Sequence, residues 1–298
     1  MKTPDATKRP TGLALYTQVA ERSSSVIIRS YSTSFGLAAK LLAPEIRQHV
    51  ENIYALVRVA DEIVDGSADE AKLSGGKVNP VHALDDLEKE VYRALRDRFS
   101  SNLVVHAFAH TANTVGFDRK IIAPFFESMR MDLWKNVHDR ASFEKYVYGS
   151  AEVVGLMCLQ AFVLGHEFSN ADRQKLVSGG RALGAAFQKV NFLRDLAADS
   201  DALGRSYFPG LVVAELTDAK RDELVADINA DLAKSAISLR MLPKSSQRAV
   251  AAAHLLFEEL NDRIAKTPAS GLKTTRISVP SFTKLMIIIR VLLGGLPK

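Results

Sequence analysis

Apolar residues recur every three or four positions along almost the whole chain, whereas the strict alternation of a half-buried strand is scarce. This spacing puts apolar side chains on one face of a helix and polar side chains on the other. The pattern therefore predicts an all-α protein. The expected helices cover residues 13–31, 44–64, 81–98, 101–115, 121–136, 142–164, 171–198, 216–240, 245–265 and 281–293.

The segments between the expected helices are short and rich in residues that end helices. Glycine, asparagine and proline gather at residues 74–80, and glycine and proline again at residues 204–210. No proline- or serine-rich linker and no repeat of fixed period divides the chain. We therefore expect one helical domain over residues 13–298, preceded by a disordered tail at residues 1–12. This tail has no apolar core, so it predicts neither a signal peptide nor a membrane helix.

The expected helix around residues 44–64 has one apolar and one acidic side. At about 100° per residue, Tyr54, Arg58, Asp61 and Asp65 fall within a narrow arc, and the opposite side offers aliphatic residues to a core. Carboxylates on an otherwise apolar helix are costly to bury unless a cation accompanies them. The pattern therefore indicates a cation-binding face.

The expected helix over residues 171–198 repeats this layout. Gln188, Asn191, Asp195 and Asp199 share one face, and Arg194 lies beside it. Aligned oxygen ligands suit hard divalent cations such as Mg²⁺, which completes its shell with water and substrate phosphate. Nearby arginines offer forked donors to diphosphate oxygens. The apolar context carries this interpretation, because the same Asp-x-x-x-Asp spacing also recurs in an ordinary charged helix between residues 218 and 231.

The overall composition narrows the choice of partner only slightly. The formal net charge of +5 suits an acidic small molecule, an anionic membrane surface or nucleic acid. Zinc-finger spacings and long basic blocks are absent, so nothing favours nucleic acid. The one cysteine, Cys158, excludes a disulfide framework, fits a reducing compartment and is expected to be a small buried hydrophobe.

The last apolar stretch, residues 285–296, is too short to span a bilayer. Two interpretations stay open. It is either a last helix packed on the core or a basic amphipathic helix in a membrane interface, with Lys284, Arg290 and Lys298 near lipid headgroups. The sequence thus predicts a cytoplasmic protein, peripheral on the inner face of the membrane in the second case, and leaves the oligomeric state open.

Several motifs, from about Ser30 to Arg276, occur in an order typical of one protein family. They are Tyr31-Ser-Thr-Ser-Phe35, Arg58-Val-Ala-Asp61-Glu-Ile-Val-Asp65, Tyr146-Val-Tyr148-Gly149-Ser-Ala151-Glu-Val-Val-Gly155, Gln188-Lys-Val-Asn191-Phe-Leu-Arg194-Asp195-Leu-Ala-Ala-Asp199 and Gly204-Arg205-Ser-Tyr207-Phe-Pro209. On these segments the chain resembles the squalene/phytoene synthases, whose members carry an N-terminal substrate flap and two aspartate-rich helices. Residues 146–155 and 182–199 look most like the bacterial members that make phytoene.

This resemblance implies an all-α, single-domain class I isoprenoid synthase bundle with a central cavity. It implies Mg²⁺, with Mn²⁺ as an alternative, at Asp61, Asp65, Asn191, Asp195 and Asp199. The implied substrate-binding residues are Tyr31, Ser32, Ser34, Arg58, Gln188, Arg194, Arg205 and Tyr207. Tyr54, Tyr146 and Tyr207 would orient the intermediate or stabilise cationic carbon through their rings. A core aromatic with a satisfied hydroxyl fits Tyr54 and Tyr146 equally well.

The implied reaction joins two geranylgeranyl diphosphates head to head, through a cyclopropylcarbinyl diphosphate, to give phytoene in carotenoid biosynthesis. NADPH is not expected, because the chain shows neither a Gly-rich dinucleotide fingerprint nor a C-terminal membrane helix. A dehydrosqualene or squalene-type synthase using farnesyl diphosphate is the alternative, and a non-catalytic assembly factor is a second. Glu152 and Phe257 depart from the family pattern, so a phosphate contact is not expected at Phe257.

Overall fold

The computed structural model describes residues 10–196 and 206–297, apart from the side chains of Thr33, Ser34 and Asp69. Within those ranges the chain is helical and forms no strand beyond one isolated bridge. The elements are α1 (Gly12–Tyr31), α2 (Thr33–Ala39), α3 (Pro44–Asp65), α4 (Ser67–Leu73), α5 (Pro80–Asp97), α6 (Leu103–Val115), α7 (Arg119–Asp132), α8 (Arg140–Val147), η1 (Tyr148–Glu152), α9 (Val153–Phe162), α10 (Asn170–Arg194), η2 (Val213–Glu215), α12 (Asp218–Leu239), α13 (Lys244–Lys266), α14 (Ala269–Leu272) and α15 (Ser281–Leu292).

The all-α prediction is confirmed, and every long helix lies where the periodicity places it. The stretch expected as one helix over residues 142–164 is instead α8 and α9 joined by η1, a single π-helical turn. The helix expected over residues 171–198 is α10, which ends at Arg194. The short helices α2, α4 and α14 escape prediction because they hold too few residues to show a period. Helix α1 begins at Gly12, while residues 1–9 lie outside the described ranges.

Local sequence explains where several helices begin. The side chains of Asn79, Asn102, Asp118 and Ser169 accept hydrogen bonds from backbone N–H groups in the first turns of α5, α6, α7 and α10. Proline occupies the first turn of α3 and α5, where its missing N–H costs nothing. Capping chemistry in short connections therefore sets these helix starts.

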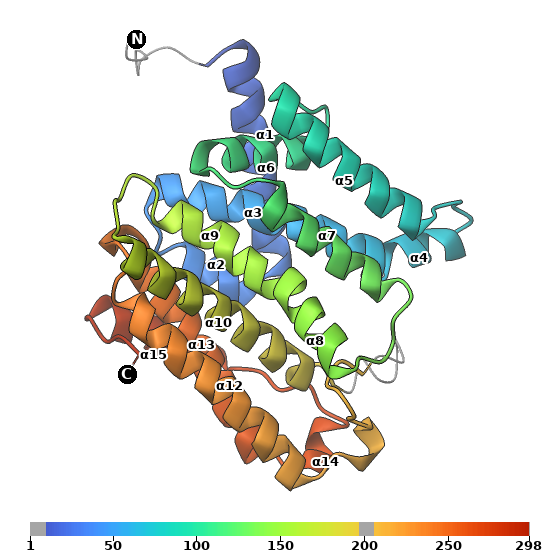
Figure 1. The fold of residues 1–298 in the computed structure, drawn as a ribbon, viewed down its shortest axis with the longest axis vertical. Coiled ribbons are helices and arrows are strands. Elements are labelled where there is room, and N and C mark those ends of the chain that lie inside the picture. The colour runs from blue at the N-terminus through green and yellow to red at the C-terminus, as the bar shows by residue number, and fades with distance from the viewer. Residues whose placement is uncertain (1–9, 197–205, 298) are drawn as a thin grey trace.

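Helix α9 contacts both helices that carry the acidic segments. It packs against α3 and against α10, which itself packs most extensively against α12 and also contacts α13. Figure 1 shows α10, α12, α13 and α15 on one side of the molecule, α5, α6 and α7 on the other, and α3 and α9 between them. The two acidic segments thus belong to neighbouring layers of one bundle.

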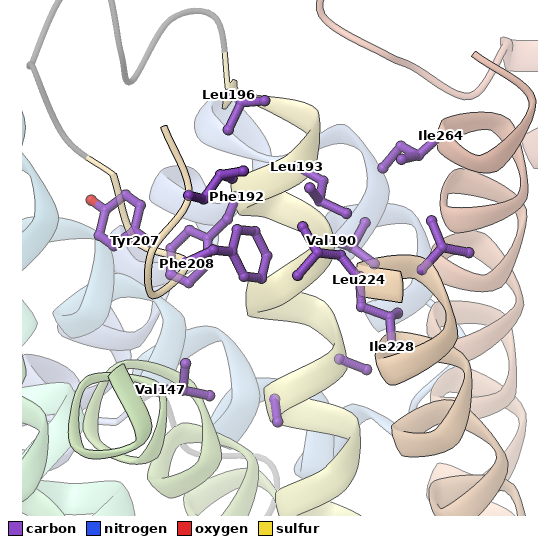
Figure 2. Close-up of a cluster of buried hydrophobic side chains, with 14 of the residues drawn as sticks. Val147, Val190, Phe192, Leu193, Leu196, Tyr207, Phe208, Leu224, Ile228 and Ile264 are labelled. Atoms are coloured by element: carbon purple, nitrogen blue, oxygen red, sulfur yellow. The ribbon is translucent and has the colours of Figure 1, made fainter. Parts of the chain in front are cut away.

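A buried apolar cluster holds the C-terminal end of α10. The rings of Phe192 and Tyr207 stack with centroids 4.1 Å apart and an interplanar angle of 9°. In Figure 2, Val190 on α10 lies beside Leu224 and Ile228 of α12. These three residues, like Phe192 and Tyr207, are buried. Because this end of α10 carries the second acidic segment, the cluster fixes where that segment lies.

Glycines allow close helix contacts around η1. A Cβ atom at Gly184 of α10 would lie 2.6 Å from the backbone oxygen of Ala151 in η1. At Gly180, one turn earlier on α10, a Cβ atom would meet nothing closer than 3.5 Å, the distance to Leu159 Cδ2. The absence of a side chain is therefore required at position 184 and not at position 180.

We expect Gly184→Ala to lower the free energy of unfolding by roughly 1–3 kcal/mol, the usual cost of overpacking. Gly180→Ala is the matched control, because it gains about 1 kcal/mol of helix propensity without the backbone clash, so its stability should be unchanged or higher. Urea unfolding followed by circular dichroism measures both. Equal stability of the two variants would contradict the tight contact.

Candidate active site

A cavity of about 820 Å³ with a mostly apolar wall lies among α1, α2, α3, α7, α9, α10, α12 and α13. The residues expected from the sequence that line it are Tyr31, Ser32, Tyr54, Arg58, Asp61, Asp65, Tyr146, Gln188, Asn191, Arg194, Asp195 and Tyr207. Asp199, Arg205 and the side chain of Ser34 lie outside the described residues. The fold thus brings both acidic segments to one cavity.

Arg58 on α3 is positioned by two neighbours. Its guanidinium pairs with Glu62, one turn later on α3, and lies over the ring of Tyr31, 4.3 Å from the ring centroid. Arg58 Nε is buried and has no hydrogen-bond partner among the described residues. The side chain therefore links α3 to the end of α1 in the cavity wall.

Asp61 and Asp65 lie one turn apart on α3. Burial raises the pKa of Asp61 well above its usual value, and the negative charge of Asp65 raises it further, while Arg58 acts in the opposite direction. Burial and like charge both disfavour the ionised carboxyl. A cation bound between these carboxylates would restore their charge.

Asp195, just after α10, has cationic partners of its own. Arg194 Nε donates to Asp195 Oδ2 at 3.1 Å, and Arg276 Nε donates to Asp195 Oδ1 at 2.6 Å. Burial alone would raise the pKa of Asp195, but these two guanidiniums outweigh it and hold the pKa below its usual value. The sequence does not single out Arg276, because this contact spans 81 positions of the chain.

Asn191 offers an oxygen suited to a cation. Its Oδ1 is buried without a hydrogen-bond donor among the described residues, one turn before Asp195. Hard cations bind such oxygens together with carboxylates, so the donor set of Asp61, Asp65, Asn191 and Asp195 fits the expected Mg²⁺. Over the described ranges, no three His, Cys, Asp or Glu side chains form a metal site by themselves. Mg²⁺ keeps several waters and also binds substrate phosphates, so either would complete its shell here.

Tyr146 and Tyr207 belong to an aromatic group in the cavity wall, with ring centroids 5.2 Å apart. The Tyr146 hydroxyl donates to Asp132, with Oη and Oδ2 2.8 Å apart. Tyr146 therefore has a satisfied hydroxyl, as the structural interpretation expects, and still lines the cavity. Tyr54 is only partly buried in the same wall. Asp132 is not evident from the sequence, where it belongs to no Asp-x-x-x-Asp pair and shares its helix with Glu127.

The departures from the family pattern have structural explanations. Phe257 is buried and stacks on Phe187 with centroids 3.9 Å apart, so it supplies apolar wall. Glu152 accepts a hydrogen bond from Arg181 at 2.5 Å, which gives its carboxylate a partner on α10. Cys158, expected to be buried, is partly buried in the cavity wall, where desolvation raises its pKa to about 12.

Comparison with known proteins assigns the chain to a family. A family model described as squalene/phytoene synthase matches residues 28–283. The chain belongs to the squalene/phytoene synthase family. This match confirms the resemblance that the sequence motifs indicated. Enzymes of this family are prenyltransferases.

Curated members of the squalene/phytoene synthase family align with most of the chain. Chloroplastic phytoene synthase 3 of Zea mays is 30% identical over 291 residues, which cover 91% of this chain and 65% of the maize protein. Chloroplastic phytoene synthase 2 of Oryza sativa subsp. japonica is 34% identical over 189 residues, covering 61% of this chain and 44% of the rice protein. The chain thus spans less than two thirds of the length of these relatives.

Solved structures share the fold. A dehydrosqualene synthase in complex with ligand superposes with a TM-score of 0.75 at 21% identity, covering 94% of this chain and 97% of that protein. The squalene synthase HpnC from Alicyclobacillus acidocaldarius gives a TM-score of 0.71 at 19% identity, covering 85% and 95%. The predicted isoprenoid synthase fold is therefore confirmed.

Substituting the acidic residues should weaken metal binding. We expect Asp61→Asn and Asp195→Asn to reduce the affinity for Mn²⁺ in the presence of inorganic diphosphate by at least about tenfold, since even the loss of a residue that only supports a metal ligand costs about that much. Asp86→Asn, on the exposed side of α5, is the matched control and should bind normally. Isothermal titration calorimetry checks this, and normal binding by either site variant would refute the assigned ligands.

Proposed function

We propose that this chain joins two molecules of geranylgeranyl diphosphate head to head and forms phytoene in carotenoid biosynthesis, through a cyclopropylcarbinyl diphosphate. The observation that carries the proposal is the meeting of both acidic segments in one mostly apolar cavity of about 820 Å³. Such a cavity offers oxygen and guanidinium groups to diphosphates and apolar wall to long isoprenoid chains.

The polar residues of the cavity fit the ionisation of an allylic diphosphate. Asp61, Asp65, Asn191 and Asp195 would hold Mg²⁺, with Mn²⁺ as the alternative, and the bound metal supplies positive charge to the departing diphosphate. Asp199 stays a further candidate ligand beyond the described residues. Because charge develops on the leaving group, donors already in place stabilise the transition state more than the ground state.

Guanidinium and neutral donors in the same wall would bind the diphosphates. Arg58, Arg194 and Arg276 line the cavity. Arg194 and Arg276 pair with Asp195 of the site, and Arg58 pairs with Glu62 on its own helix. Forked donors of this kind bind phosphate oxygens in pairs. Gln188 and Ser32 add neutral donors; Ser34 and Arg205 remain proposed contacts.

The apolar wall would protect the cation left after ionisation. Phe35 lies 5.5 Å from Phe187 and 5.4 Å from Phe257, measured between ring centroids, and all three residues line the cavity. Aromatic faces attract cations, and a dry wall keeps water from quenching the intermediate. Proton loss then ends the sequence, so no NADPH is required.

Substrate length is the finer part of the proposal. Curated relatives named phytoene synthases, at 30% and 34% identity, favour geranylgeranyl diphosphate. The fold shared with a dehydrosqualene synthase keeps farnesyl diphosphate as the alternative. The length of the prenyl chain that fits depends on the depth of the cavity, which its aromatic and aliphatic side chains set.

Product analysis tests the proposal directly. Purified protein with Mg²⁺ should convert geranylgeranyl diphosphate to phytoene without NADPH, and excess EDTA should abolish turnover. Mass spectrometry of the hydrocarbon, with farnesyl diphosphate in a parallel reaction, identifies the substrate. If only farnesyl diphosphate reacts and gives dehydrosqualene, the proposed substrate is wrong and the proposed reaction type is right. If neither diphosphate gives a product, the non-catalytic alternative is favoured.

We also propose peripheral membrane association through α15. No described helix is long and apolar enough to cross a bilayer. The buried residues Ile287 and Val291 of α15 join an apolar cluster with α13, while Arg290 adds positive charge. The exposed apolar side chains of this region are Phe282, Leu285, Met286, Ile289, Leu292 and Leu293. Helix α15 thus packs on the core and also presents an apolar face.

The double variant Phe282→Ser, Leu285→Ser should reduce cosedimentation with vesicles containing anionic lipid by at least about tenfold, since two large apolar side chains no longer enter the bilayer. Ile237→Ser removes an equally exposed apolar side chain from α12 and serves as the control. Thermal melts should show all variants folded. Unchanged sedimentation of the double variant would refute α15 as the contact.

A further inference from the structure

Asp132 is a cavity carboxylate that belongs to neither aspartate motif. It is the last residue of α7, 6% exposed, and lines the same cavity as Asp61. Its Oδ2 accepts the hydrogen bond from the hydroxyl of Tyr146, which is 3% exposed. A buried phenol and a buried carboxylate therefore form a hydrogen-bonded pair in the wall of the reaction chamber.

Close contacts between α7 and the segment around Tyr146 fix the backbone on both sides of this pair. Ser128 Oγ on α7 donates to the backbone oxygen of Tyr146 at 3.1 Å. A Cβ atom at Gly149 would lie 2.1 Å from the backbone oxygen of Pro124 on α7, so this contact requires glycine. Gly149 belongs to η1, and π-helical turns inside helices occur frequently at functional sites. These contacts set the distance between α7 and the Tyr146 side chain.

Aromatic rings shield the pair from solvent. The Tyr146 ring lies 5.1 Å from His138, 5.2 Å from Tyr207 and 6.0 Å from Phe192, measured between centroids; Figure 2 shows Tyr207 and Phe192 in this cluster. Burial, and then the charge of Asp132, raise the pKa of Tyr146 well above its usual value. Tyr146 thus stays a neutral hydroxyl and donates to Asp132.

We propose that Asp132 is a positioning residue for Tyr146 that takes up the phenol proton when Tyr146 removes a proton from the cationic intermediate. This inference rests on the proposed function, since only a reaction that passes through a carbocation and ends in proton loss needs such an acceptor. The hydrogen bond fixes the hydroxyl proton toward Asp132. The lone pairs of Tyr146 Oη are then free to accept a proton from another direction.

The step balances without an oxidant or reductant. A C–H bond on the carbon next to the cationic carbon breaks, and its electron pair becomes the second bond of a new carbon–carbon double bond. The proton passes to Tyr146 Oη while the proton already on Oη passes to Asp132 Oδ2. Tyr146 is neutral before and after, and Asp132 changes from carboxylate to carboxylic acid. Asp132 then returns the proton to solvent when the product leaves.

A purely structural link between α7 and α8 is the competing explanation, and one substitution separates the two. Asp132→Asn keeps an oxygen that accepts the Tyr146 hydrogen bond but loses the basicity that takes up a proton. Glu127→Gln makes the same carboxylate-to-amide change on α7, at an exposed residue paired with Lys145, and is the matched control. Tyr146→Phe removes the proton carrier.

The test measures steady-state kinetics, with whichever prenyl diphosphate the wild-type protein consumes, and the isotope effect with that substrate deuterated at carbon 1. We expect Asp132→Asn to lower kcat by about 100-fold or more, the usual contribution of a positioned acid or base, with kcat/KM falling equally. The isotope effect should rise because proton removal becomes slower. Glu127→Gln should match the wild type.

Two outcomes would overturn the role of Asp132. The first is a near-normal kcat in Asp132→Asn. The second is a lower kcat together with an unchanged isotope effect and a lowered melting temperature, a combination that indicates a purely structural residue. If Asp132→Asn fails to fold, Tyr146→Phe gives the same isotope readout, and an unchanged effect there refutes the relay. Absence of any product from the wild-type protein would instead overturn the proposed function.

Discussion

Charge inside an apolar cavity is the constraint on which the rest of this structure depends. Carboxylates removed from water need cations, or they lose their charge. Burial, and after it the negative charge of Asp65, raise the pKa of Asp61 well above its usual value. Asp195 is also removed from water, but Arg194 and Arg276 lie beside it and hold its pKa below its usual value. An added cation would restore the charge of the first acidic segment, while the second already holds two guanidiniums.

Such a site works only if the helices that carry it keep their positions, and the packing provides this. The end of α10 is clamped by the stacked rings of Phe192 and Tyr207. Gly184 lets α10 approach the backbone of η1 more closely than any side chain would permit. Catalysis of this kind depends on groups placed before the reaction begins, so a rigid wall is as necessary as the polar residues that it holds.

The sequence predicts whatever depends on local geometry. Helical periodicity places Asp61 beside Asp65 and Asn191 beside Asp195, and the structure confirms that these residues line one cavity. It does not predict Asp132 or Arg276, because each gains its role from a partner on another element. The π-helical turn that divides residues 142–164 holds Gly149 close to α7, and no periodicity in the sequence reveals this turn or this contact. The fold is thus more predictable than the details of the site.

We propose that diphosphate, metal and isoprenoid chain share the cavity between α3 and α10. The decisive measurement is a crystal structure with Mn²⁺ and a non-ionising thiolodiphosphate analogue of geranylgeranyl diphosphate. We expect anomalous peaks beside Asp61, Asp65, Asn191 and Asp195, with the prenyl chain running past Phe35, Phe187 and Phe257. Metal peaks elsewhere, or an analogue bound outside this cavity, would show that the proposed shared site is wrong.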